Sequence, residues 1–587
     1  MRPDLTAREW RRRWWLLVAG TLLVLLAVLF LWQLGRAAVA LDRAGHAASV
    51  LTTQVAHGDV DGAEATLDQL SDDTDTARRR TDGLGWAVLA RLPVVGDDVD
   101  AIRTVSRELD RVVVQALPAV VEVADEIQLD TFSPQDGRID LAAVERTLPV
   151  VVRTREVLEQ AGVEIAAIEP DALFGRLRVP IRDVQRSMAS ARLAASAAQA
   201  AGDLLPTMLG GEGKRRYLLL IQNNAEVRSL GGIPGSFAVV NVNKGRMSMG
   251  RQGSALDVRQ VEDPAVEMTD GERSVFPDTL VRDLRNTTFS PDFPRAAEIA
   301  KALTDDALDT SFDGVVSVDP GTLAHLLEGL GPVTLDTGLE LTADNVVEEL
   351  LNGTYRRHAD DLAAQDDVFV DAARRIFDAF VAGEGHVQTV LEGLVRASTE
   401  NRVLLWSAHE EEQERISTTG VAGIPPGGED APRVGLFLND AAGGKMQYYL
   451  QTTHQLRSVR CLDEDQQELT LQTHLRSTAP QGDLPLPITG INPDVERGHQ
   501  RLNVRVIAPE GGRIESLALD GDPQLVVGGD LDGRQVAIVP VTLEPGDSVA
   551  LTATMLSSTG QPGRAVLTTT PGIEPAANDV RAASACR

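Results

Sequence analysis

The hydrophobic pattern of the chain begins with an uncharged run at 14–32, which is long enough to cross a hydrocarbon core of about 30 Å as a helix. Arginines at 11–13 precede this run and place residues 1–13 in the cytoplasm and the rest of the chain outside. The pattern therefore predicts a transmembrane helix over 14–34. A cleaved signal peptide with a processing site at 38–40 is the alternative. The apolar region of such peptides is usually about 7–15 residues long, so the length favours a retained anchor.

The segment 35–207 has the period of α-helices. Apolar side chains recur at helical spacings, as at Leu51, Val55, Leu67 and Leu70, and alanine is abundant. Prolines and glycines interrupt the pattern several times. We expect an extracytoplasmic helical stalk or bundle of about four to six helices whose apolar faces pack together.

Strand-like and helix-like patterns alternate from 208 to 455. Four apolar runs have the length of buried strands, namely YLLLI, FAVVNV, GVVSV and GLFLND. This alternation predicts an α/β (α+β) layered core domain. From 456 to 587 the period changes to two, with short runs separated by Gly, Pro and Asp turns, which predicts a C-terminal β-sandwich. The expected fold is therefore multidomain: a transmembrane helix, a helical stalk or bundle, a layered core domain and a β-sandwich.

Composition narrows the function classes. The 587 residues carry a formal net charge of −30, and binding to a nucleic-acid backbone depends on clustered Lys and Arg, so no nucleic-acid partner is expected. The chain contains no P-loop, G-x-S-x-G, H-E-x-x-H or C-x-x-C motif. Its nine histidines form no pair at ligand spacing, so no dedicated zinc site is expected.

Two cysteines, Cys461 and Cys586, lie near the two ends of the C-terminal region. In an exported protein this placement predicts a disulfide, and a closed loop of that size stabilises by about 4–5 kcal/mol. Two unpaired thiols in a cytosolic chain are the alternative.

A polar loop between the first two strand-like runs of the core domain is the candidate site. The loop carries Asn224, Glu226, Arg228 and Gly232, and it follows the buried run YLLLI. Polar side chains at the end of a buried strand, beside glycines that permit close backbone approach, form many binding sites. The alternative is a loop whose polar residues hydrogen-bond the loop itself.

The phrase QNNAEVRSLGGIPGSFAVVNVNKGR, at 222–246, resembles the signature of the bacterial domain-of-unknown-function family numbered four thousand and twelve. Further segments at 285–300, 313–333 and 341–355 resemble later parts of the same family in the same order. Two more follow at 402–413 and 436–450, so the resemblance covers most of 214–450.

A fainter resemblance is to LytR-CpsA-Psr proteins, which transfer glycopolymers from polyprenyl pyrophosphate carriers to the cell wall. In both, a strand leads to a polar loop with an arginine, and a helix with paired arginines follows later. The resemblance implies that arginines hold the pyrophosphate and that Glu226, or Asn224, holds Mg²⁺. The implied catalytic residues are Arg228, Arg356 and Arg374. The implied ligand-binding residues are Asn224, Arg228, Gly232, Arg356 and Arg375.

The arginines have a competing interpretation. Arg374 and Arg375 are adjacent, so on a helix only one of them can face a given pocket. In so acidic a chain, these arginines can instead pair with nearby Asp and Glu.

These features predict a single-pass protein of the bacterial plasma membrane, with its bulk outside, that assists cell-wall or surface-glycopolymer assembly. The resemblance to LytR-CpsA-Psr proteins implies a glycopolymer phosphotransferase activity. The expected partners are the membrane and a lipid-linked glycopolymer or peptidoglycan. The alternative is a non-catalytic envelope scaffold or glycan-binding protein. Convergence of Arg228, Arg356 and Arg374 with Glu226 around one cleft would favour the transferase, whereas arginines scattered over the surface would argue against it.

Overall fold

The computed structural model describes most of the chain after residue 58. The described residues are 36, 39–40, 43–51, 53–54, 59–93, 95–126, 133–424, 430–482, 484–490, 492–574 and 581–586. They divide into two compact units. The first comprises the described part of Met1–Phe132 together with Leu141–Leu205, and the second comprises Ser133–Asp140 and the described part of Pro206–Arg587.

The predicted transmembrane helix needs correction. No helix in the described part of the chain is long and apolar enough to cross a membrane. The run at 14–34, on which the prediction was based, lies outside the described residues. The transmembrane part of the predicted fold class is therefore wrong, and what the structure contains is a helical unit and a mixed α/β unit with several sheets.

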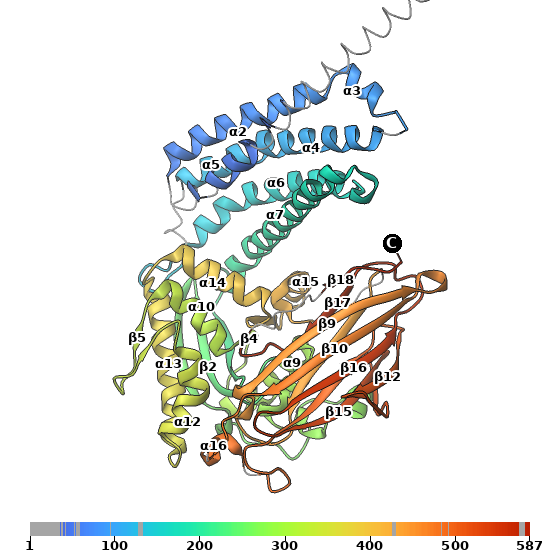
Figure 1. Ribbon diagram of the computed structural model, residues 1–587. Helices are drawn as coiled ribbons and strands as arrows, with labels where there is room; N and C mark the ends of the chain where they lie inside the picture. Colours follow the sequence, from blue (N-terminus) through green and yellow to red (C-terminus); the bar gives the residue numbers. More distant parts are fainter. Residues whose placement is uncertain are drawn as a thin grey trace, which may run out of the picture. The chain divides into compact units, whose positions relative to one another are not determined.

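The first unit consists of helices whose apolar faces pack together, as their period predicts (Figure 1). They are α2 (Val60–Thr81), α3 (Leu84–Leu89), α4 (Gly96–Gln115), α5 (Leu117–Glu126), α6 (Leu141–Ala166), the short 3₁₀ helix η2 (Pro170–Ala172) and α7 (Gly175–Met208). Asp59 caps α2 by accepting a hydrogen bond from the Gly62 N–H. Within this unit the buried Glu108 carboxylate pairs with Arg107 and Arg111, so its charge is compensated inside the bundle.

A five-stranded sheet forms the centre of the α/β part of the second unit, in the order β3-β2-β1-β4-β7. The strands are β1 (Arg215–Asn223), β2 (Ile233–Asn243), β3 (Arg246–Ser254), β4 (Gly314–Val318) and β7 (Leu404–Ser407). β1 pairs antiparallel with β2 and parallel with β4, while β7 pairs antiparallel with β4. The predicted runs YLLLI, FAVVNV and GVVSV form β1, β2 and β4.

Helices pack around this sheet in two groups. The first group shares a core with Leu218, Leu220 and Phe237 of the sheet; it consists of α8 (Asp270–Val275), η4 (Asp278–Val281), η5 (Leu284–Phe289) and α9 (Phe293–Leu308). The second group forms a separate core; it consists of α10 (Pro320–Leu330), α11 (Val346–Glu348), the π-helical turn η6 (Glu349–Gly353), α12 (Thr354–Arg357), α13 (Leu362–Ala382) and α14 (Val387–Thr399).

Short elements connect the longer helices and strands of the second unit. They are η3 (Ala255–Asp257), β5 (Val333–Thr334), β6 (Glu340–Leu341), α15 (Glu410–Ile416), η7 (Gly420–Ala422), η8 (Met446–Tyr449), η9 (Asp463–Asp465) and α16 (Leu486–Thr489).

The C-terminal part is a sandwich of two sheets, ordered β13-β12-β16-β10-β9 and β14-β15-β11-β8-β17-β18 (Figure 1). The first sheet contains β9 (Leu450–Cys461), β10 (Gln467–Ser477), β12 (Arg513–Leu519), β13 (Asp522–Gln524) and β16 (Ser548–Leu556). The second contains β8 (Arg433–Asp440), β11 (Gln500–Ile507), β14 (Gly528–Leu531), β15 (Arg534–Leu543), β17 (Ala565–Thr569) and β18 (Arg581–Ala582).

β8 shows where sequence pattern and tertiary pairing differ. Its run GLFLND is expected among the strands of the core domain, but β8 pairs with β11 and β17 in the sandwich. An apolar run of this length fits any buried strand, so its period cannot specify which sheet it joins.

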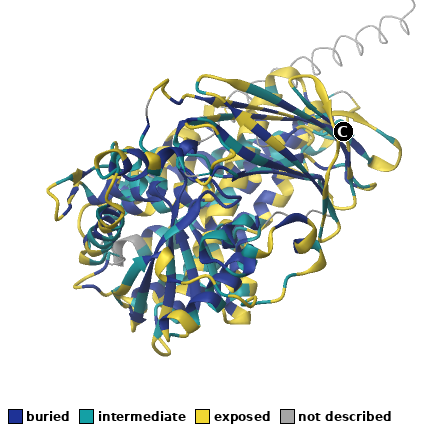
Figure 2. Cartoon of the chain, turned by 90° about the horizontal axis from the view of Figure 1, so that it is seen from below, coloured by how far each residue is buried: buried dark blue, intermediate teal, exposed yellow. Residues whose placement is uncertain are grey.

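The second sheet of the sandwich is buried on both faces at the end of β11, from Val504 to Ile507. Leu502, Val504 and Val506 point into the sandwich core, whereas Ile507, two residues after Arg505, packs in the core shared with the α/β sheet. Buried residues run along the inner strands, whereas exposed residues lie on loops, on helix surfaces and on the outer strands (Figure 2). The side chain of Arg505 therefore enters an apolar layer between two sheets.

Candidate functional site

The loop between β1 and β2 is buried throughout, since every residue of 221–234 is inaccessible or nearly so. A buried loop must find partners for its backbone polar groups. Here the Asp440 N–H donates to the Val227 carbonyl at 2.9 Å, and the Gln447 side-chain oxygen accepts from the Val227 N–H at 3.3 Å. The Ser229 hydroxyl donates to the Phe289 carbonyl at 2.7 Å. The loop therefore joins the α/β sheet to β8 of the sandwich.

Gly232 and Asn224, two of the predicted ligand-binding residues, have packing roles in this loop. A Cβ at Gly232 would lie 2.3 Å from the Asn223 carbonyl carbon, so backbone excludes any larger residue. The Asn224 side-chain amide donates to Asp319 at 3.0 Å. Asp319 also caps α10 and pairs with Arg402 at 2.6 Å.

Glu226 lies at the centre of a buried charged cluster. One of its oxygens accepts from Arg228 at 2.9 Å, and the other accepts from the Lys445 ammonium. Burial raises the pKa of Glu226, but the charges of Lys445 and Arg228 outweigh burial and lower it to about 2. The carboxylate is therefore ionised and paired at neutral pH.

The residues around Glu226 do not fit Mg²⁺. This ion prefers several oxygen ligands in near-ideal octahedral geometry and keeps most of its waters. Both oxygens of Glu226 are occupied by cationic side chains, and no group of three acidic or histidine ligands gathers there in the part of the chain that the structure describes.

Arg228 and Arg505 form what we call the buried arginine pair. Their side chains come from the loop after β1 and from β11, and their residues are 5% and 4% exposed. Both guanidinium groups lie against the ring of Phe289, at 4.6 and 5.9 Å from its centroid, and Arg505 also lies 5.0 Å from the Phe276 centroid. Burial, and then the charge of Arg228, lower the pKa of Arg505 to about 10.

The pair has unused hydrogen-bond donors. Arg228 donates to Glu226 and to the Val227 carbonyl, but its Nε–H has no partner. Arg505 makes no ion pair with any described residue, and its Nε–H and one Nη–H group are buried without a partner. Buried guanidinium donors are normally satisfied by an acceptor.

Asp440 completes the cluster without neutralising it. Its carboxylate accepts from Gln447 at 2.8 Å and from the Gly443 N–H at 2.6 Å. Burial, followed by the charge of Glu226, raises the pKa of Asp440. Arg228, Arg505 and Lys445 face two acidic groups, so the cluster carries an excess positive charge even when Asp440 is ionised.

The other predicted arginines do not join this cluster. Arg374 and Arg375, on α13, are about two-fifths exposed and both pair with Asp336 and Asp371. Arg356 is exposed at the end of α12. Of the predicted site residues, the structure therefore brings Glu226 and Arg228 together and adds Lys445, Asp440 and Arg505, which the sequence did not indicate.

Arg402 shows what a structural arginine in this unit looks like. It is as buried as Arg505, but it pairs with Asp319 at 2.6 Å and with Glu400 at 2.5 Å, and it donates to the Gly572 carbonyl at 2.7 Å. All its nitrogens are used, so its charge is fully compensated.

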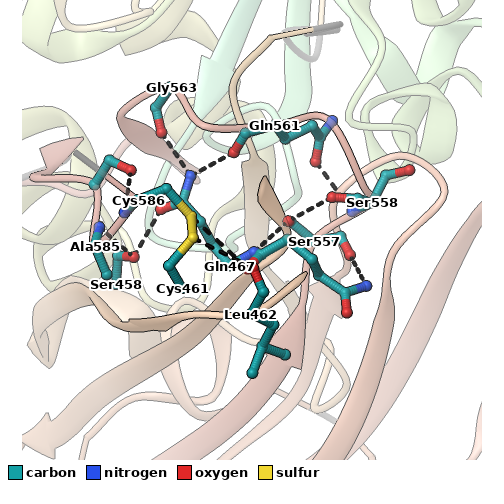
Figure 3. The surroundings of a disulfide bond; sticks show 12 residues. Ser458, Cys461, Leu462, Gln467, Ser557, Ser558, Gln561, Gly563, Ala585 and Cys586 are labelled. Atoms are coloured by element: carbon teal, nitrogen blue, oxygen red, sulfur yellow. Dashed lines mark hydrogen bonds between the residues drawn. A yellow bond between two sulfur atoms is a disulfide. The ribbon is translucent and has the colours of Figure 1, made fainter. Parts of the chain in front are cut away.

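Cys461 and Cys586 are joined by a disulfide, with their Cα atoms 4.8 Å apart (Figure 3). Within the described residues, the one group of three potential metal ligands consists of these two cysteines and Asp465. Because the thiols are oxidised to a disulfide, this group is a cross-link and not a metal centre.

Residues 212–355 match the family described as protein of unknown function (DUF4012). The family recognised from the motifs after Lys214 is thereby confirmed. The match contains the β1–β2 loop with Glu226 and Arg228, while Lys445 and Arg505 lie outside it.

Solved structures with local similarity include the protein gbs0355 from Streptococcus agalactiae, at 13% identity over 36% of this chain and 74% of that chain, with a TM-score of 0.23. The transcriptional regulator yvhJ from Bacillus subtilis shows 14% identity over 35% of this chain and 76% of its own, with a TM-score of 0.18. Scores this low carry no argument about fold or function. No curated protein matches the sequence.

The expected function and location need correction. The prediction of a single-pass envelope protein of the plasma membrane depended on an apolar spanning helix, and no such helix occurs among the described residues. The comparisons provide a domain of unknown function and no membrane anchor. The membrane-anchored role is therefore wrong, and function must be argued from the buried charged cluster.

Proposed function

We propose that this protein is a binding protein for an oxyanion, a phosphate or carboxylate group, which the buried arginine pair holds between the β1–β2 loop and β11. The observation that carries the proposal is Arg505, a buried cation that has unused N–H donors and no anionic partner.

The free-energy cost of leaving buried N–H donors without acceptors supports a ligand at this position. Two or more unsatisfied donors on a buried cation cost about 1–3 kcal/mol each, and contact with Phe276 and Phe289 offsets only part of this. An anion that accepts from both guanidinium groups removes the penalty, and guanidinium is the side chain that best matches the geometry of phosphate and carboxylate. Glu226 accepts a hydrogen bond from Arg228, which orients the guanidinium in advance.

The ligand class follows from the donors present. Arg228 and Arg505 offer fork-like N–H groups, and Lys445 supplies a more exposed positive charge at the edge of the cluster. A lipid-linked glycopolymer or peptidoglycan, the partner expected from the sequence, stays a prediction; a phosphate within such a polymer belongs to the same chemical class.

The test is calorimetric titration of the full chain with inorganic phosphate, pyrophosphate and acetate, each at constant ionic strength with chloride as the reference anion. Phosphate-type and carboxylate-type ligands are thereby distinguished. We expect binding of one of these anions to wild type, and loss of at least tenfold in affinity in Arg505→Met.

Arg501→Met is the matched control, because Arg501 lies on the same strand and the same face as Arg505 but is partly exposed. We expect it to bind like wild type. Binding of no anion to wild type, or equal binding by Arg505→Met, would overturn the proposal.

A further inference from the structure

The C-terminal segment 581–586 covers one edge of the sandwich with few contacts of its own. β18 pairs with β17 over two residues only, Ala565 with Ala582 and Val566 with Arg581. On its other side β17 pairs with β8 over four residues. β18 is therefore the edge strand of this sheet, and β17 would be the edge without it.

The segment also closes part of the sandwich core. Ala582 is 6% exposed and packs in the same core as Ala565 and Leu567. The only other described residue of the segment that bonds to the sandwich through its backbone is Ala585, whose N–H donates to the Ser458 hydroxyl at 3.0 Å. So short a strand, with one small buried side chain, is held weakly by noncovalent contacts.

The surface that receives the segment is, by contrast, strongly tied together (Figure 3). Gln467 is completely buried and accepts from Ser458 at 2.7 Å. Its amide group donates to the carbonyl oxygens of Gln561 and Gly563, at 2.6 and 2.7 Å. This hydrogen-bonded hub joins the β9–β10 hairpin to the loop before β17, so the hairpin end remains in place whether or not the C-terminal segment is attached.

The disulfide is the strongest link between the two parts. Cys461 ends β9, and Cys586 lies four residues after β18. Cys461 is exposed, so a reducing thiol can reach it. In the reaction, an external dithiol attacks and loses two electrons and two protons. The Cys461–Cys586 bond breaks, each sulfur gains one proton, and the dithiol closes to its own disulfide.

We propose that residues 581–586 form a redox-released strap. In the oxidised protein the disulfide holds β18 against β17 and keeps the sheet edge covered. Reduction releases the segment and leaves β17 as the edge strand of the sheet.

Hydrogen exchange of the full chain, measured by mass spectrometry with and without a dithiol reductant, tests the proposal. We expect peptides containing 565–567 and 581–586 to exchange at least tenfold faster after reduction, whereas peptides of β10 stay protected. Counting of free thiols confirms that both cysteines are reduced.

Two variants separate the disulfide from the other contacts. Cys461→Ser combined with Cys586→Ser should expose the same peptides without reductant. Ser458→Ala removes the hydrogen bonds to Ala585 and to the Gln467 side chain but keeps the disulfide, so its strap should stay protected. Unchanged protection of 581–586 in protein with two free thiols, release in Ser458→Ala under oxidising conditions, or a disulfide that resists reduction in the folded protein would each overturn the proposal.

Discussion

Replacement of Arg505 by methionine separates a ligand-binding arginine from a structural one. The side chain is buried and its charge is uncompensated, and its pKa is lowered from 12.5 to about 10. At about 1.4 kcal/mol per pKa unit, the folded protein disfavours the charged form by about 3 kcal/mol. Methionine removes this penalty and keeps the apolar contacts with Phe276 and Phe289, but it loses about 1 kcal/mol of cation–π attraction.

We therefore expect Arg505→Met to raise the free energy of unfolding of the ligand-free protein by about 2 kcal/mol. The sign of this effect follows from linkage, because the unfolded chain binds the Arg505 proton more tightly than the folded protein does. The lowered pKa of Arg505 therefore destabilises the folded state at every pH below about 10, and the destabilisation disappears as the pH approaches 12.5. The anion should reverse the order of stability, since it binds wild type and not the variant.

The assay is urea denaturation at pH 7 in chloride buffer, followed by tryptophan fluorescence, to which Trp406 contributes from its position against the core that contains Phe276. Arg501→Met should change the free energy of unfolding by less than about 0.5 kcal/mol, because the Arg501 side chain is partly exposed. If Arg505→Met were less stable than wild type by 2 kcal/mol or more without ligand, Arg505 would be a compensated structural cation and the reasoning would fail.

Three further predictions use the same denaturation assay. Arg402→Met should lower the free energy of unfolding by about 3–5 kcal/mol, because it leaves the buried Asp319 carboxylate without its cationic partner. A decrease of less than about 1 kcal/mol would contradict the view that Arg402 is a structural arginine and Arg505 is not. Gly232→Ala should destabilise by about 1–3 kcal/mol or prevent folding, whereas Gly235→Ala, whose nearest contact is 3.7 Å away, should be tolerated; equal effects would refute the steric role. The pKa of Glu226 is lowered from 4.5 to about 2, so its ionised form contributes about 3 kcal/mol of stability above pH 4.5, and this contribution is lost as the pH falls to 2. Glu226→Gln should lack this part of the acid transition. A pH profile of stability equal to that of wild type would argue against the paired carboxylate.

The local pattern of apolar and polar residues was sufficient to predict the helices and strands that depend on interactions between residues close in sequence. Period 3.6 predicted the helices of the first unit, and apolar runs predicted β1, β2 and β4. Asp319 followed by proline begins α10 as capping chemistry requires. Local pattern could not assign β8 to its sheet, because strand pairing is a long-range choice. The membrane prediction was wrong, since no helix among the described residues is long and apolar enough to cross a bilayer.

The candidate site also combines features that the sequence determines with features that only tertiary packing decides. The sequence by itself determined that Glu226 and Arg228 share a polar loop after a buried strand, but it did not indicate Arg505. In β11, Arg505 faces away from Val504 and Val506, because side chains alternate along a strand. An alternating strand usually turns its polar residues to water. Only the packing of the second sandwich sheet against the α/β core buried that outer face and brought Arg505 beside Arg228 without a counter-charge. Burial depends on what covers a residue, and the residues that cover Arg505 are more than 200 positions away in the chain.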